Sequence, residues 1–259
     1  MTSILQEIAA YKRSEVALLK AELTMSEIEE EIETNVRLDF KAAISKSDRV
    51  NIIAELKKAS PSKGVLIEDF DVEKIAVFYH QGGAAALSVL ADKKYFQGSP
   101  DYVKKAKTVT GLPILFKEFI IDPFQIRFAR FKQADAILLI VSLLKADEIV
   151  SMIKLAGKYC LDVIVEVHDS DEAKIAIDSG AQIIGVNNRN LKDFSVSLKT
   201  SETMSKIIPD DIIKIAESGI FEPADITRLK EFGYNCFLIG EALVKSNDPV
   251  NLLKSLKSA

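Results

Sequence analysis

Charged residues end several apolar runs of this chain, where they could carry out acid–base chemistry. The run ILFK, residues 114–117, ends on Lys117, and other apolar runs end on Glu55 and Lys57 or on Glu166. A charge inside a buried strand is costly, whereas a charge at a strand tip faces water or takes part in chemistry. An ammonium group and a carboxylate held together could pass protons to and from a substrate.

The elements that would position these charges follow a regular alternation. Eight short apolar runs with β-strand composition are separated by segments of helical periodicity, several of which begin at Asp or Ser and end at Gly. A repeat of strand and helix every roughly 20 to 35 residues predicts an α/β fold, the closed (β/α)8 TIM barrel. The predicted strands are residues 51–57, 85–90, 112–117, 135–141, 162–167, 182–188, 211–217 and 235–240.

The alternative fold is an open, doubly wound sheet, which normally has a Gly-rich turn after its first strand. Here the first strand is followed by KASPSKG without a GxGxxG pattern, so we favour the barrel. No low-complexity tract or Pro/Gly-rich linker interrupts the chain, and residues 1–259 are expected to form a single domain. Residues 1–48 precede the first strand as an amphipathic helical extension, which we expect to lie as a lid over the barrel mouth.

Composition excludes several classes of function. The net charge of -4 argues against a nucleic-acid partner, which would require a basic face. Cys160 and Cys236 lack the spacing of a metal site and are predicted to be buried thiols in a reducing compartment. The N-terminal segment mixes charged and apolar residues, unlike a signal peptide, and no apolar stretch is long enough to cross a membrane. We therefore expect a cytoplasmic protein without a membrane partner.

The strand-end charges have a consistent parity. Because side chains alternate between the two faces of a strand, Ile53, Glu55 and Lys57 share one face. Three other strands have an apolar residue two positions before the charge at the strand end, so that both lie on one face. These pairs are Leu115 and Lys117, Ile164 and Glu166, and Ile215 and Glu217. One such charge alone could simply reach solvent, but charges from four strands indicate an active site at the C-terminal barrel mouth. Residues with this placement are Glu55, Lys57, Lys117, Glu166 and Glu217, and the sixth strand adds Asn187 and Arg189.

Residues near these charges receive other interpretations. Glu118 has the opposite parity to Lys117, so we expect it to point toward the helices or to hold a loop. The turns Ser218-Gly219-Ile220 and Gly240-Glu241-Ala242 follow the last two strands, where backbone N–H groups of barrels commonly bind phosphate. His80 is interpreted as structural, and His168 is left outside the mechanism.

Specific motifs resemble those of the indole-3-glycerol phosphate synthase family. The segments ELKKASPSKG, KKYFQGS, ILFKEFIIDPFQI, VIVEVHD, GVNNRNL, IAESGI and FLIGEALV occur in family order and spacing, and the resemblance extends over nearly the whole chain. It implies a decarboxylating lyase of tryptophan biosynthesis that closes the indole ring of 1-(2-carboxyphenylamino)-1-deoxyribulose 5-phosphate, releasing carbon dioxide and water. No metal or organic cofactor is implied. A monomer is expected, and association with other enzymes of the pathway stays open.

The resemblance also implies roles for the matching residues. Lys117 would be the general acid toward the ribulose carbonyl oxygen, Glu166 the acid/base partner for dehydration, and Lys57 the group that holds the anthranilate carboxylate. Glu55 and Asn187 would orient the lysines and the sugar hydroxyls. The remaining matches complete the polar ring (Arg189 and Glu217), line the aromatic pocket (Phe96 and Phe119) or surround the phosphate (Ser60, Ser218, Gly219, Gly240 and Glu241).

Two rival functions stay open at this point. In a class I aldolase-like barrel, a strand-end lysine would form a Schiff base with a carbonyl substrate, although this class does not predict the segment ELKKASPSKG. A non-catalytic phosphate-binding barrel would not need acid and base groups on opposing strands. An indole-forming assay separates both rivals from the synthase.

Overall fold

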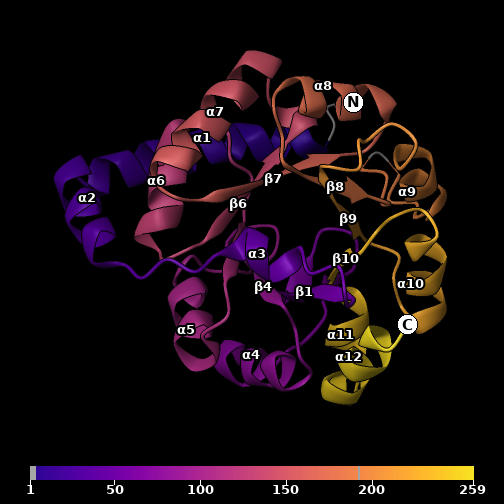
Figure 1. The fold of residues 1–259 in the computed structure, drawn as a ribbon. Coiled ribbons are helices and arrows are strands. Elements are labelled where there is room, and N and C mark those ends of the chain that lie inside the picture. The colour runs from indigo at the N-terminus through magenta and orange to yellow at the C-terminus, as the bar shows by residue number, and fades with distance from the viewer. Residues whose placement is uncertain (1–3, 192) are drawn as a thin grey trace.

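Eight parallel strands close into a barrel in the computed structural model, which describes residues 4–191 and 193–259 (Figure 1). Neighbouring strands follow the order β1-β10-β9-β8-β7-β6-β5-β4 around the barrel. The predicted (β/α)8 fold is therefore confirmed, and each predicted strand lies within two residues of an observed one. The barrel strands are β1 (Asn51–Leu56), β4 (Ala86–Leu90), β5 (Ile114–Lys117), β6 (Ala136–Ile140), β7 (Asp162–Val167), β8 (Ile183–Asn187), β9 (Ile213–Glu217) and β10 (Cys236–Ile239).

Helices surround the barrel on its outer side (Figure 1). Three of them, α4, α6 and α8, begin where Asp71, Asp122 and Asp169 accept hydrogen bonds from backbone N–H groups of the first turn. Such caps satisfy donors that the helix itself leaves unpaired. The outer elements are α4 (Val72–Gln81), α5 (Asp101–Thr110), α6 (Pro123–Phe131), η1 (Val141–Leu143), α7 (Ala146–Lys158), α8 (Ser170–Asp178), α9 (Lys199–Met204), α10 (Pro223–Lys230), α11 (Glu241–Lys245) and α12 (Pro249–Lys257).

A short hairpin and three helices complete the chain. The strands β2 (Ala59–Ser60) and β3 (Gly64–Val65) pair after β1. The N-terminal extension forms α1 (Ile4–Glu22), α2 (Met25–Thr34) and α3 (Phe40–Ile44), with α1 and α2 against α6 and α3 against β1 and β4.

The N-terminal extension contacts both ends of the barrel. Near α3, the backbone N–H groups of Leu38 and Lys41 donate to Asp135 and Asp162, which lie at the start of β6 and β7. Phe40 and Ile44 of α3 belong to the apolar cluster inside the barrel. The first residues of α1, in contrast, line the cavity at the C-terminal strand ends.

The core consists of two layers, one inside the barrel and one between the barrel and its helices. Ile53, Leu115, Ile164 and Ile215 belong to the inner cluster. Residues adjacent to them in the strands belong to the outer one, among them Ile52, Phe116, Val165 and Ala216. The predicted parity of these apolar residues is thus confirmed. Because the alternation continues along each strand, the strand-end charges follow the inner residues into the mouth.

Cys160 departs from the sequence prediction, whereas Cys236 follows it. Cys236 is buried in the inner layer, but Cys160 is exposed. The reason is its position in the turn after α7, where its backbone has a φ of 54° and its N–H donates to Gly157. A turn residue lies at the surface, even where an apolar strand follows.

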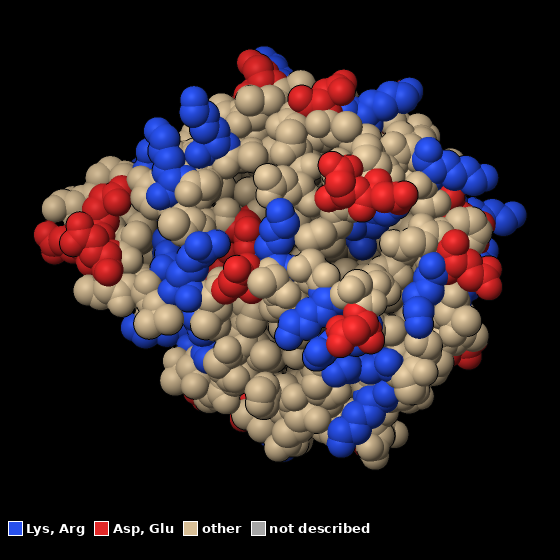
Figure 2. Space-filling model, viewed as in Figure 1, with Lys and Arg blue, Asp and Glu red and all other residues tan. Residues whose placement is uncertain are grey.

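Two surface properties bear on partners. On the face shown in Figure 2, basic side chains lie beside acidic ones, and the described residues of this face form no continuous basic surface. Among the helices within residues 4–191 and 193–259, none is both long and apolar enough to cross a bilayer.

Candidate active site

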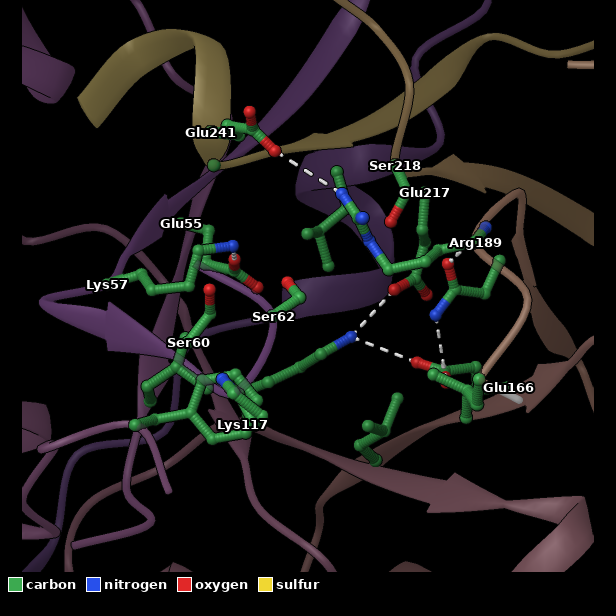
Figure 3. Close-up of a pocket in the computed structure, with 18 of the residues that line it drawn as sticks. Glu55, Lys57, Ser60, Ser62, Lys117, Glu166, Arg189, Glu217, Ser218 and Glu241 are labelled. Carbon is green, nitrogen blue, oxygen red and sulfur yellow. Dashed lines mark hydrogen bonds and ion pairs between the residues drawn. The ribbon is translucent and has the colours of Figure 1, made fainter. Parts of the chain in front are cut away.

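A cavity opens at the C-terminal ends of the barrel strands, and side chains from many strands converge on it (Figure 3). Every residue that the sequence analysis assigned to the site lines this cavity. They are Glu55, Lys57, Ser60, Phe96, Lys117, Phe119, Glu166, Asn187, Arg189, Glu217, Ser218, Gly219, Gly240 and Glu241.

Lys117 occupies the middle of the cavity between two carboxylates. Its Nζ lies 2.6 Å from Oε2 of Glu217 and 3.1 Å from Oε2 of Glu166. The lysine ends β5, Glu217 comes from β9 on the opposite side of the barrel, and Glu166 comes from β7, two strands away; the dashed lines in Figure 3 mark both contacts. One ammonium group thus bridges two acid/base candidates inside hydrogen-bond distance.

Burial and neighbouring charges set the protonation states of this trio. Burial lowers the pKa of Lys117, but the charges of Glu217, Glu166 and Glu55 outweigh it and raise the pKa above its ordinary value. Burial raises the pKa of Glu217, and repulsion from Glu166 adds to this increase. Burial also acts on Glu166, yet Lys117, His168 and Asn187 together hold its pKa below the ordinary range. The two glutamates therefore differ in basicity, which suits separate proton-transfer roles.

Glu55 and Lys57 form a second ion pair on β1 and just beyond it. Nζ of Lys57 donates to Oε1 of Glu55 over 2.5 Å. Gly240 makes room for this pair, because a Cβ atom at that position would lie 2.5 Å from Oε1 of Glu55 and 3.1 Å from Nζ of Lys57. The turn after β10 thus needs glycine for close approach.

Asn187 connects Glu166 to the loop that carries Arg189. Its Nδ2 donates to Oε1 of Glu166 over 3.2 Å, and its Oδ1 accepts the backbone N–H of Arg189 over 3.0 Å. The guanidinium of Arg189 donates to the backbone oxygen of Phe194 and lies 3.3 Å from Glu241. These contacts direct a cation toward the rim of the cavity.

The rim near Glu241 gathers positive charge. The Glu241 carboxylate pairs with Arg189, with Lys63 and, over 2.9 Å, with Lys245. Burial raises its pKa, but these lysines outweigh burial and lower the pKa to about 2. Glu241 therefore carries a negative charge among three cations that could also bind a phosphate.

Phe96 and Phe119 form an aromatic wall on another side of the cavity. Their ring centroids are 6.0 Å apart with an interplanar angle of 40°. An aromatic substrate ring could pack against this pair. Glu118, between Lys117 and Phe119, binds Lys12 of α1 over 2.8 Å and accepts the N–H of Phe119 over 2.7 Å. This confirms its predicted loop-holding position.

His168 is a polar neighbour of the site that the sequence analysis left out. Its Nε2 lies 3.3 Å from Oε1 of Glu166, and its Nδ1 lies 3.0 Å from Oε2 of Glu172. Burial lowers the pKa of His168, yet the two carboxylates outweigh it and raise the pKa to about 10. The sequence indicates the contact with Glu166, because His168 follows it by two residues and shares its face of the strand. The contact with Glu172 forms only because the chain turns into α8.

Comparison with known proteins identifies the family. Residues 5–256 match the family described as "Indole-3-glycerol phosphate synthase". The chain belongs to the indole-3-glycerol phosphate synthase family. The enzyme of that name from Chlorobium luteolum is 44% identical over 96% of this chain and 95% of its own length. The one from Aromatoleum aromaticum is 41% identical over 99% of both chains.

Solved structures outside the indole-3-glycerol phosphate synthase family share the fold. The 3-hexulose-6-phosphate synthase of Salmonella typhimurium superposes with a TM-score of 0.65 at 15% identity, covering 80% of this chain and 96% of that one. Thiamine phosphate pyrophosphorylase of Pyrococcus furiosus gives a TM-score of 0.60 at 16% identity, covering 80% and 93%. At this level of identity the likeness concerns the barrel alone.

Proposed function

We propose that this chain converts 1-(2-carboxyphenylamino)-1-deoxyribulose 5-phosphate to indole-3-glycerol phosphate, as a carboxy-lyase of tryptophan biosynthesis. The observation that carries the assignment of residues is the position of Lys117, whose ammonium group lies between Glu166 and Glu217 at the cavity centre. Family membership supports the reaction itself.

Lys117 acts as general acid in ring closure. The aromatic carbon that bears the carboxylate attacks the ribulose carbonyl carbon, and Lys117 donates a proton to the carbonyl oxygen as negative charge develops there. Loss of carbon dioxide then restores the aromatic ring. A raised pKa keeps Lys117 protonated in the free enzyme, so the proton is present when substrate binds.

Glu166 serves the later dehydration. The new hydroxyl leaves as water, which requires one group to donate a proton to it and a base to take a proton from the adjacent CH2 carbon of the new ring, so that the carbon–carbon double bond of indole forms. Glu166 lies within hydrogen-bond distance of Lys117 and Asn187, so it can exchange protons in the same cavity. Glu217 holds Lys117 in place and balances its charge.

The ends of the substrate have separate binding regions. Lys57 binds the anthranilate carboxylate after leaving its partner Glu55, and Phe96 and Phe119 contact the aromatic ring. At the rim, Arg189 and Lys63 supply positive charge for the phosphate. Backbone N–H groups near Ser60, Ser218, Gly219, Gly240 and Glu241 complete the phosphate region.

The N-terminal extension, residues 1–48, belongs to the same single domain, and its first helix closes the site, whereas α3 packs at the opposite end of the barrel. Ile4 and Leu5 at the start of α1 lie on the cavity wall, which supports a lid function for this helix. We also propose a cytoplasmic location, in keeping with two free thiols, and action as a monomer, alone or associated with other enzymes of the pathway.

The decisive experiment mixes purified protein with the carboxyphenylamino substrate and follows indole fluorescence. The chain contains no tryptophan, so the product signal rises from a low background. Production of indole-3-glycerol phosphate that depends on Lys117 supports the proposal. Absence of product, or a covalent adduct at Lys117 after borohydride treatment with substrate, contradicts it and favours a Schiff-base enzyme.

A further inference from the structure

Lys12 of α1 is a buried lysine that the proposed reaction does not use. Its side chain has no exposed surface, and its Nζ lies 2.8 Å from Asp92 and 2.8 Å from Glu118. A third carboxylate, Glu15, lies 2.6 Å away on the same helix. Lysine is almost never fully buried unless it is paired, and docking a helix does not by itself require such burial.

An exposed ion pair on the same helix provides the comparison. Lys20 of α1 contacts Asp122 over 2.7 Å, and both side chains are partly exposed. This pair attaches α1 to the start of α6, where solvent screens the charges. Attachment of α1 therefore does not explain why Lys12 is buried, and the reason lies in the groups that its partners Asp92 and Glu118 bind.

Each buried carboxylate holds the backbone of one aromatic residue of the cavity. Oδ1 of Asp92 accepts the N–H groups of Tyr95 over 2.5 Å and Phe96 over 3.0 Å. Oε1 of Glu118 accepts the N–H of Phe119 over 2.7 Å. The second oxygen of each carboxylate faces Lys12. One ammonium group thus joins the loop of Phe96 to the loop of Phe119.

We propose that Lys12 is a positioning residue that sets the spacing of the Phe96–Phe119 wall and thereby the fit of the substrate's aromatic ring. This inference rests on the proposed function, because it assigns the ring to that wall. The two rings lie 6.0 Å apart and come from different strand ends, β4 and β5. The Phe96 loop has further contacts with α1, through Tyr95 with Glu7 and with Tyr11, but among the contacts described the Lys12 cluster is the one that joins both loops to a single group.

Electrostatics explains why the cation is needed. Without Lys12, Asp92 and Glu118 would be two buried anions that face each other. Even with Lys12 present, burial and the charge of Asp92 raise the pKa of Glu118 to about 7. Removal of Lys12 would force protonation or separation of the carboxylates, and either change weakens their hold on the two loops.

Amide hydrogen exchange of the unliganded protein tests the link without any assumption about the reaction. In Lys12→Met, peptides covering residues 92–98 and 117–121 should exchange about tenfold faster or more than in the wild type, since a buried pair has been broken. Lys20→Met, the matched control, should leave both peptides unchanged. Unchanged exchange in Lys12→Met would overturn the proposal.

A milder variant covers the case in which Lys12→Met does not fold. Glu118→Gln leaves Lys12 paired with Asp92 and Glu15. We expect faster exchange in residues 117–121 and unchanged exchange in residues 92–98. Equal acceleration of both peptides would contradict separate links to the two loops.

Binding measurements then separate positioning from general destabilisation. Lys12→Met should raise KM for the carboxyphenylamino substrate by about tenfold while changing the Kd of inorganic phosphate less than about twofold. An equal loss for both ligands would indicate a merely structural lysine and overturn the proposal. A wild-type protein without turnover would refute the proposed function instead, and hydrogen exchange would still decide the role of Lys12 in the two loops.

Discussion

Nζ of Lys117 lies 2.6 Å from Oε2 of Glu217, although 100 positions separate the two residues in the chain. This ion pair bridges the barrel interior from β5 to β9, and Glu166 approaches the same ammonium group from β7. A pair this close inside a protein is strong and directional. The barrel therefore presents substrate with a lysine whose orientation is set before binding.

Replacement of Lys117 should remove most of the activity. General acid catalysis contributes about 10²- to 10⁴-fold, so kcat of Lys117→Ala should fall at least this far. Lys117→Arg should not restore it, because a guanidinium keeps its proton. Lys254→Ala, at an exposed site on α12, is the control and should retain wild-type kcat. Near-normal turnover in Lys117→Ala, with an unchanged circular dichroism spectrum, would exclude the general-acid role.

Substitution of Gly185 on β8 should displace Glu217 without touching substrate. A Cβ atom at this position would lie 2.2 Å from Oε1 of Glu217 and 3.0 Å from Ile164. Because small displacements in an active site can cost about 10²-fold, Gly185→Ala should lower kcat by this order. Gly157→Ala on α7, where a Cβ atom meets nothing within 4 Å, is the matched control and should raise helix stability slightly. Equal activity of both variants would refute the steric argument.

His168 should make stability depend on pH in the alkaline range. The pKa of His168 is raised to about 10, so the folded state binds a proton more tightly than the unfolded state does. This stabilisation is fully present below pH of about 6.5 and is lost as pH rises toward 10, by about 1 to 3 kcal/mol. Urea unfolding at pH 6 and pH 9 measures the loss. His168→Gln should reduce the difference in the free energy of unfolding between the two pH values. If that difference is unchanged, groups other than His168 cause the pH dependence.

Two N-terminal truncations should behave differently. Deletion of residues 1–34 removes α1 and α2 with the buried side chains of Val16 and Ile28, so the melting temperature should fall, and the remaining barrel should bind substrate more weakly because a lid contributes closure. Deletion of residues 1–45 also removes Phe40 and Ile44, which have 0% and 1% of their surface exposed. Loss of two buried side chains costs about 2 to 5 kcal/mol each, a large part of a typical total stability. Melting temperatures of the two truncated proteins measure this difference. Full activity of the protein that lacks residues 1–34 would contradict a lid function for α1.

Inorganic phosphate should protect the folded protein if the cations near Glu241 bind it. The melting temperature should rise with phosphate at constant ionic strength, because a ligand of the folded state alone stabilises that state. Arg189→Gln should reduce the increase, since it removes one of the cations at the rim. A melting temperature that does not change up to roughly tens of millimolar phosphate would contradict phosphate binding at these cations.

Local patterns of the sequence account for much of the fold. Strand alternation at Ile53 and Leu115 predicted which side chains point into the barrel, and the inner cluster has this arrangement. Such patterns are local, because the two faces of a strand follow from backbone geometry alone. The same alternation led to the cavity position of Lys117 and Glu166, which both lie in its lining.

The exposure of Cys160 and the partners of His168 could not be obtained in this way. Cys160 lies in a turn whose backbone has a positive φ, and apolar neighbours in sequence do not determine burial there. His168 pairs with Glu166 and Glu172 only because the chain turns after β7. Turn geometry and the exact end of a strand depend on contacts with the rest of the molecule.

By itself, the sequence determined the barrel, the inward faces of its strands and the family, since these depend on periodicity and on motifs. Only the tertiary structure decided which charges meet. It brought Lys12 to Asp92 and Glu118, and Lys117 to Glu217, across long separations in the chain. The physical reason is that ion pairs form where barrel closure and helix packing exclude water, and no local pattern specifies these buried partners.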